Sequence, residues 1–133
     1  GLSVPEGPAL FVCTRNSARS PLAAALWRHR TGRPAASAGT HPAERIHPGA
    51  VAAARRAGVD LADDTPSSID DVTRPPAIVV TVCDQAHEEL DPDPSWLHWS
   101  VPDPVGDGTA AAFDVAVTEL AERIDALTAE AAS

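Results

Sequence analysis

Short apolar runs alternate along this chain with longer amphipathic or alanine-rich stretches. The runs at 9–13 (Ala-Leu-Phe-Val-Cys) and 77–83 (Ala-Ile-Val-Val-Thr-Val-Cys) are almost continuously apolar. Such runs are typical of strands that a parallel sheet buries on both faces. Two further short strands are expected at 35–38 and 97–101.

Helical signals separate these strands. Ser20 is the expected N-cap and Pro21 the first residue of a helix that Gly32 and Pro34 terminate. Three more helices are expected, at 48–57, 85–89 and 110–131. The polar segments between the elements are expected to be loops, at 14–19, 40–47, 60–73 (with one irregular turn at 68–71) and 102–109.

The last of these helices carries one apolar stripe at helical spacing, formed by Phe113, Val117, Leu120, Ile124 and Leu127. Strands that alternate with helices predict an α/β fold with a parallel sheet and right-handed crossovers. We expect a single three-layer domain over residues 1–133, with residues 1–8 as a flexible N-terminal segment. The expected sheet is four-stranded and parallel, with strand order 2-1-3-4 and helices on both faces.

The charge and hydrophobicity of the chain indicate which binding partners are expected. The chain has 133 residues and a formal net charge of −9, and all ten of its basic residues are arginines. No basic patch is visible, so a nucleic-acid partner is not expected, and any anion site must be local. No signal peptide or apolar stretch of about 20 residues is seen, so a cytoplasmic protein without a membrane partner is expected, and a monomer.

Residues 13–20 (Cys-Thr-Arg-Asn-Ser-Ala-Arg-Ser) carry the clearest chemistry. Cys13 ends a buried strand, and the loop after it runs into a helix N-terminus, where backbone N–H groups and the helix dipole attract anions. Arg19 adds a planar fork for two oxygens of a tetrahedral oxyanion, and Ser17 and Ser20 add hydroxyl donors. The same positive potential favours the nucleophilic thiolate of Cys13.

Other uses of these residues are weaker. A buried cysteine is often a small apolar core residue, but this reading does not explain the arginine six positions later. The two cysteines, Cys13 and Cys83, lie too far apart in sequence for a disulfide scaffold. The histidines do not form a metal-ligand spacing with the cysteines, so no metal site and no bound cofactor are expected.

These motifs resemble those of the low-molecular-weight protein tyrosine phosphatase superfamily, which includes the thioredoxin-coupled arsenate reductases. The segments that carry the resemblance are 11–21, 37–40, 46–51, 58–61, 79–83 and 98–104. The resemblance implies that loop residues Thr14, Arg15, Asn16, Ser17, Ala18, Arg19 and Ser20 bind the oxyanion. It also implies that Asp103 is a general acid that protonates the leaving oxygen. Asn16, Ser20 and Ser37 match positions that brace the loop.

Two loop positions depart from the family pattern. Arg15 stands where the family usually has glycine, and Ala18 stands where it often has a second cysteine. Arg15 therefore either adds a cation at the mouth of the site or points to solvent.

Arsenate and phosphate have similar size, shape and charge, so the loop alone does not choose between them. The phosphatases usually carry aromatic residues after the Asp-Pro pair, whereas Val105-Gly-Asp-Gly follows here and the chain contains no tyrosine. His98-Trp99 and the glycine shortly after Asp103-Pro104 resemble the reductases. Arg19-Ser-Pro21 resembles the phosphatases instead.

A reductase also needs a second thiol. Cys83 matches the second redox cysteine of the thioredoxin-coupled enzymes, but Leu90 replaces their third cysteine. Either Cys83 attacks the Cys13–arsenic adduct, or an external thiol reductant does so, with Cys83 a buried bystander. The reductant would be a thioredoxin, mycothiol or glutathione system, and the protein partner a thioredoxin or mycoredoxin-type reductase.

Three functions therefore follow from the sequence. The first is a thiol-dependent arsenate reductase. The second is a low-molecular-weight phosphatase that hydrolyses phosphotyrosine or small aryl phosphates through a cysteinyl-phosphate. The third is a non-catalytic anion-sensing module that kept the loop.

Overall fold

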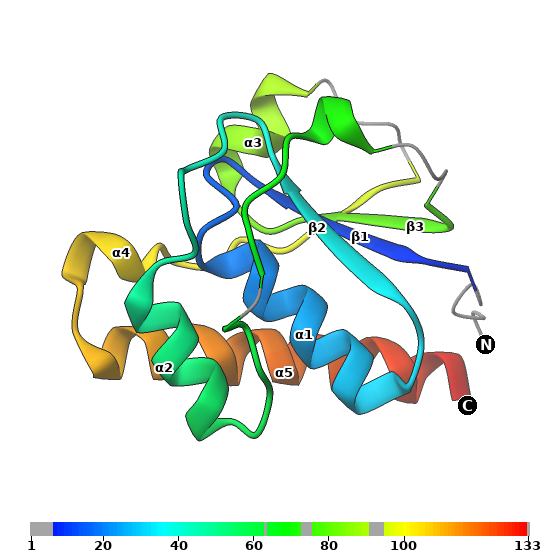
Figure 1. The fold of residues 1–133 in the computed structure, drawn as a ribbon. Coiled ribbons are helices and arrows are strands. Elements are labelled where there is room, and N and C mark those ends of the chain that lie inside the picture. Colours follow the sequence, from blue (N-terminus) through cyan, green and yellow to red (C-terminus); the bar gives the residue numbers. More distant parts are fainter. Residues whose placement is uncertain (1–6, 63, 73–75, 91–94, 133) are drawn as a thin grey trace.

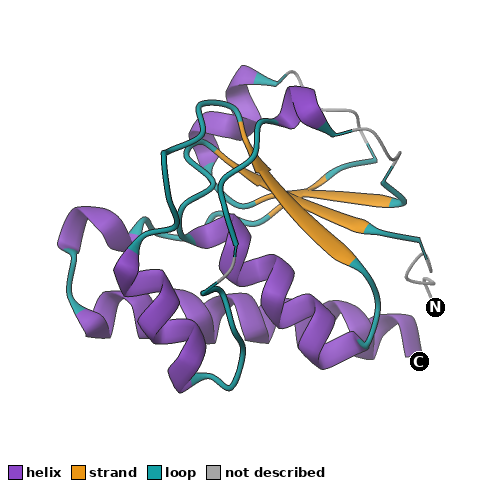
Figure 2. Cartoon of the chain, in the orientation of Figure 1, coloured by secondary structure: helices purple, strands orange, loops and turns teal. Residues whose placement is uncertain are grey.

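The sheet is built around a strand that is buried along its whole length. The structure is a computed structural model that describes residues 7–62, 64–72, 76–90 and 95–132. β1 (Ala9–Cys13) pairs in parallel with β2 (Ala35–Gly39) on one side and with β3 (Ile78–Thr81) on the other. β4 (Leu97–His98) pairs in parallel with β3. The strand order β2-β1-β3-β4 confirms the predicted four-stranded parallel sheet (Figure 2).

Helices cover both faces of this sheet. On one face, α1 (Arg19–Thr31) packs between the sheet and α5 (Ala110–Ala132), and α2 (Pro48–Arg56) lies beside them (Figure 1). On the opposite face lies α3 (Asp84–Glu89). A single 3-10 turn, η1 (Ile69–Asp71), falls at the irregular turn expected near 68–71. The stripe predicted on α5 faces the core, with Phe113, Leu120 and Ile124 buried and Val117 and Leu127 partly buried against it.

The expected N-cap of the first helix is wrong. α1 begins at Arg19, and its N-cap is Ala18, whose side chain makes no capping hydrogen bond. Ser20 therefore lies inside the first turn. Its hydroxyl is not free to cap, because it already contacts Cys13 and Asn16.

Two strands are shorter than predicted, and one predicted loop contains a helix. β3 ends at Thr81 because Cys83 leaves the strand to cap α3 with its sulfur. β4 ends at His98. Within 102–109, α4 (Pro104–Asp107) forms with Asp103 as its N-cap and proline in its first turn, a combination that favours a helix start.

The start of β1 is hydrogen-bonded to the segment before β3. The carbonyl of Pro8 accepts a hydrogen bond from the backbone N–H of Ala77 at 2.8 Å. Residues 1–6 of the expected flexible segment lie outside the described residues. Within the described part of the chain, no helix has the length and apolar character to cross a membrane.

Candidate active site

Cys13 lies at the carboxyl end of the central strand, next to the ends of its neighbours. Its Cα pairs with that of Gly39 in β2, and the preceding Val12 pairs with Thr81 in β3. Ligands of open parallel sheets bind beyond these carboxyl ends. A pocket of about 300 Å³ opens there, lined by Cys13, Arg15, Ser17, Ala18, Arg19, Ala43, Arg45, His47, Pro48, Asp103 and Val105.

The sulfur of Cys13 is buried and hydrogen-bonded. The residue is only 3% exposed, its Sγ lies 2.9 Å from Ser20 Oγ, and it accepts from the backbone N–H of Asn16 at 3.2 Å. The loop therefore holds the sulfur through a backbone N–H group and a side-chain hydroxyl.

Asn16 holds the loop in its turned shape. Its φ is 52°, the one left-handed backbone among the described non-glycine residues. Its side chain donates from Nδ2 to Ser20 Oγ at 2.8 Å and accepts at Oδ1 from the backbone N–H of Ser67 at 2.8 Å. Asparagine adopts this conformation more readily than most residues, and these bonds leave it 1% exposed.

Arg19 and Asp103 meet at the wall of the pocket. Arg19 Nη1 donates to the carbonyl of Val101 at 2.9 Å, and its Nη2 lies 3.9 Å from Asp103 Oδ2. Asp103 is half-exposed, and its Oδ1 accepts from the backbone N–H of Val105 at 3.0 Å. These contacts hold a guanidinium and a carboxyl beside the space above Cys13.

The segment 40–47 clamps the loop from outside through backbone hydrogen bonds. The N–H groups of His41, Ala43 and His47 donate to the carbonyls of Thr14, Arg15 and Ser17, at 2.7, 2.8 and 2.8 Å. This clamp brings Arg45 and His47 to the pocket. Arg45 lies outside the sequence motifs, and His47 lies in the motif segment 46–51, but the motifs assign it no role at the site. The signal that could have found them is topological, because β2 neighbours β1 and its following loop must pass the same edge.

The remaining predicted loop residues are placed differently from one another. Arg15, Ser17 and Ala18 line the pocket. Ser37 instead lies in β2 opposite Phe11 and lines another hollow. Among the hydrogen bonds of the described residues, none joins Ser37 to the loop.

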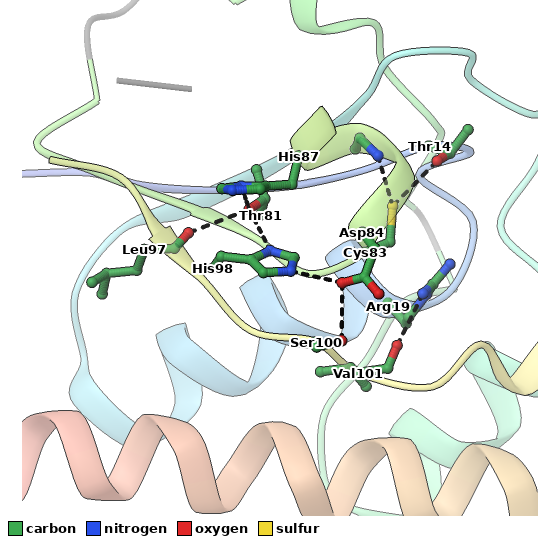
Figure 3. Close-up of polar contacts among 11 residues, drawn as sticks. Thr14, Arg19, Thr81, Cys83, Asp84, His87, Leu97, His98, Ser100 and Val101 are labelled. Carbon is green, nitrogen blue, oxygen red and sulfur yellow. Dashed lines mark hydrogen bonds and ion pairs between the residues drawn. The ribbon is translucent and has the colours of Figure 1, made fainter. Parts of the chain in front are cut away.

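Cys83 lies on the other side of Arg19. Its Sγ is 3.2 Å from the hydroxyl of Thr14 and accepts from the backbone N–H of Ala86 at 3.4 Å (Figure 3). Both cysteines are buried free thiols. Cys83 lines a second pocket of about 320 Å³, and Arg19 and Asp103 line both pockets.

A separate chain of polar contacts lies beside Cys83 and joins residues of β3, α3 and β4. Thr81 Oγ1 lies 2.9 Å from His87 Nδ1 and 2.8 Å from His98 Nδ1, and the two rings stack at 4.2 Å (Figure 3). Asp84 Oδ1 is 2.7 Å from His98 Nε2 and accepts from Ser100 Oγ at 2.9 Å. These two bonds, that of His98 first, hold the pKa of the Asp84 carboxyl below its usual 3.8.

The described residues offer no grouping of three or more His, Cys, Asp or Glu side chains that could hold a metal ion. The groups gathered at the site are a thiol, a carboxyl, guanidinium groups and backbone donors. Such a set suits nucleophilic attack on an oxyanion with acid assistance.

Comparison with known proteins shows that the chain is similar to known enzymes. Curated arsenate reductases from Bacillus licheniformis (34% identity; 86% of this chain and 89% of the relative) and Brevibacillus brevis (34%; 72% and 75%) are similar to it. A crystal structure of arsenate reductase from Archaeoglobus fulgidus superposes with a TM-score of 0.78 at 30% identity, covering 91% of this chain and 98% of that one. A low molecular weight protein tyrosine phosphatase from T. tengcongensis shares the fold, with a TM-score of 0.81 at 23% identity and coverage of 93% and 99%.

The family described as low molecular weight phosphotyrosine protein phosphatase matches residues 9–133, which is nearly the whole chain. The resemblance inferred from the loop and the Asp-Pro pair is thereby confirmed. The chain belongs to the low molecular weight phosphotyrosine protein phosphatase family.

Proposed function

We propose that this protein is an arsenate reductase that uses Cys13 as its nucleophile and an external thiol as its electron source. One observation carries the proposal. The pocket above Cys13 holds Arg19 and Asp103 but, among the described residues that line it, no Phe, Tyr or Trp. A phenol ring needs an apolar slot, whereas an arsenate ion needs only donors and a cation. The names of the curated relatives support the same choice.

The geometry of the pocket supports the first half of the proposed reaction. Arg19 and the N–H groups of the loop hold the oxyanion, so that its central atom faces the thiolate of Cys13. As the S–As bond forms, Asp103 donates a proton to the leaving oxygen, which departs as water. The capping bond from Val105 holds the Asp103 carboxyl at the pocket rim for this step.

The second half needs another sulfur. Among the described contacts, Cys83 Sγ meets the hydroxyl of Thr14 and the N–H of Ala86, and no contact with Cys13 is present. A disulfide requires Cβ atoms within about 4.5 Å of each other. We therefore assign the second step to an external thiol, either a small molecule or a thioredoxin or mycoredoxin-type protein.

The second candidate is a low molecular weight phosphatase. The same loop binds phosphate, and the Arg19–Asp103 arrangement serves a cysteinyl-phosphate equally well. A single comparison separates the two. Purified protein is assayed for arsenite release with thioredoxin, glutathione and mycothiol systems, and for hydrolysis of an aryl phosphate.

The expected result is arsenite release that Cys13→Ser abolishes and Cys83→Ser retains. Efficient hydrolysis without arsenite release would select the phosphatase. Loss of arsenite release in Cys83→Ser, with folding intact by circular dichroism, would assign the second step to a Cys13–Cys83 disulfide. Activity of either kind in Cys13→Ser would refute both mechanisms.

A further inference from the structure

Two guanidinium groups at the mouth of the Cys13 pocket have no acidic partner among the described residues. Arg15 and Arg45 are exposed and line the pocket together with Arg19. Among the described contacts, neither takes part in a hydrogen bond or ion pair. Asp103 is the one carboxyl group among the described lining residues, and it lies beside Arg19 at 3.9 Å.

Several other arginines of this chain pair with an acidic residue. The net charge is −9, and Arg28, Arg30 and Arg56 each pair with an aspartate. Positive charge left unpaired at the opening above a nucleophile raises the local concentration of anions. The oxyanion itself is bound deeper, by Arg19 and the loop amides, so Arg15 and Arg45 are available to a second group.

The fold holds these two arginines together. Arg15 belongs to the loop after β1, and Arg45 belongs to the segment after β2. The two arginines are 30 residues apart in the sequence. The bond from the N–H of Ala43 to the carbonyl of Arg15, at 2.8 Å, fixes one segment against the other. The pair therefore rests on the same clamp that shapes the catalytic loop.

We propose that Arg15 and Arg45 form a second anion subsite, which binds a carboxylate or phosphate group carried by the molecule that reacts at Cys13. This inference rests on the proposed arsenate reductase function, in which this molecule is the thiol that reduces arsenate. An acidic group bound at the mouth holds the thiol with its sulfur directed into the pocket. Guanidinium groups suit this task because they bind carboxylates and phosphates through paired N–H donors.

The thiol step transfers two electrons from sulfur to arsenic. The thiolate RS⁻ attacks Cys13 Sγ of the arsenic adduct, and the S–As bond breaks with its electron pair on arsenic. Arsenic passes from the +5 to the +3 state and leaves as arsenite after taking up a proton, while the two sulfurs join as Cys13–S–S–R. A second RS⁻ then releases the Cys13 thiolate and RSSR. In total, arsenate and two RSH give arsenite, RSSR and water.

The subsite is tested first without any arsenate. In a Cys83→Ser background, Cys13 is the only thiol, and its modification is timed with three methanethiosulfonates that end in a sulfonate, a hydroxyl or a trimethylammonium group. We expect the sulfonate reagent to react fastest relative to its rate with a free thiol. Arg15→Gln and Arg45→Gln should each lower that preference by about two- to fivefold, as for an exposed ion pair.

Two controls distinguish binding at the subsite from a general effect of the protein's charge. Arg55→Gln removes an equal charge from an exposed arginine that does not line the pocket, and should leave the preference unchanged. Added salt should reduce the preference for the sulfonate reagent and leave the hydroxyl reagent unaffected. Equal relative rates for the sulfonate and hydroxyl reagents, or equal effects of all three substitutions, would overturn the proposal.

Two further assays identify the source of the acidic group. Arsenite release is compared with 3-mercaptopropionate and 2-mercaptoethanol, and hydrolysis is compared with carboxyphenyl phosphate and phenyl phosphate. A rise in KM in Arg45→Gln for the acidic thiol alone assigns the subsite to the reductant, and a rise for the acidic ester alone assigns it to a leaving group. No selective rise in either pair would overturn the subsite.

The two proposals fail separately. Charge-selective modification of Cys13 without arsenite release from any thiol would refute the reductase and keep the subsite. If arsenite is released at a rate that changes neither with the charge of the thiol nor with the Arg15 and Arg45 substitutions, the reductase proposal stands and the subsite is refuted.

Discussion

Ser20 decides how the reactive sulfur is held. The residue has no exposed surface, its oxygen accepts from Asn16 Nδ2, and Cys13 Sγ lies 2.9 Å away. A serine expected to cap a helix end instead contacts the sulfur of Cys13, and the helix does without a side-chain cap.

Substitutions of Asp103 can distinguish its effect on catalysis from its effect on stability. Asp103→Asn removes the proton donor but keeps an oxygen that can cap α4, because asparagine is as good an N-cap as aspartate. We expect kcat for arsenite release to fall by about 10²- to 10⁴-fold. The midpoint of urea unfolding should stay near that of the parent protein.

Asp103→Ala is the matched variant, because it removes the acid and the cap together and should lower both kcat and the unfolding midpoint. A kcat for Asp103→Asn close to the parent value would remove Asp103 from the role of general acid.

At the scale of elements, the site depends on how tightly the loop after β1 meets the end of β2. Gly39 is the last residue of β2, and a Cβ built there would lie 2.7 Å from the carbonyl oxygen of Thr14 and 3.0 Å from the Cβ of Asn16. Glycine is required here for close approach and not for a left-handed turn. The strand end and the catalytic loop therefore fit only without a side chain at this position.

Gly39→Ala should accordingly disturb both folding and binding. Overpacking against backbone atoms costs about 1–3 kcal/mol, and here the atoms that must yield belong to the anion loop. We expect a lower free energy of unfolding in urea and weaker protection of Cys13 by phosphate against alkylation. Gly106→Ala is the control, because a Cβ there meets nothing within 4 Å. Similar effects of the two substitutions would contradict the close-approach argument.

At the scale of the whole molecule, exposed ion pairs join helices that are distant in sequence. Arg30 in α1 holds the carboxylate of Asp125 in α5 through two donors. This pairing, chiefly its hydrogen bonds, lowers the pKa of Asp125 below 3.8. A carboxyl whose pKa is lower in the folded state contributes stability above its unfolded pKa and loses it as the pH falls through its folded pKa.

Asp125→Asn should therefore be less stable than the parent protein at neutral pH, and this difference should disappear as the pH falls below 3.8. Urea unfolding midpoints across this range measure it, and added salt should shrink the difference at neutral pH. Glu122→Gln on the same helix serves as the control, because its carboxyl has no partner among the described contacts. A difference that persists in strong acid would show that Asp125 acts through packing and not through charge.

Much of this architecture could be predicted from local patterns, because β1, α5 and the loop from Cys13 to Ser20 each carry a strong signal within one segment. The place of Arg45 and His47 at the pocket could not be found in this way, although His47 lies in the motif segment 46–51, since it depends on hydrogen bonds between two segments. The helix α4 was missed because its four residues have no apolar periodicity, and only the Asp103-Pro104 start marks it.

The polar chain beside Cys83 constrains where its hydrogens can lie. Asp84 as a carboxylate can only accept, so the hydrogen between it and His98 belongs to Nε2 of the ring. Thr81 Oγ1 contacts Nδ1 of both His87 and His98 and also donates to the carbonyl of Leu97 at 3.4 Å. Because a hydroxyl carries one hydrogen, it cannot donate to both rings, so at least one of the two stacked imidazoles must itself supply a hydrogen from Nδ1 to Thr81.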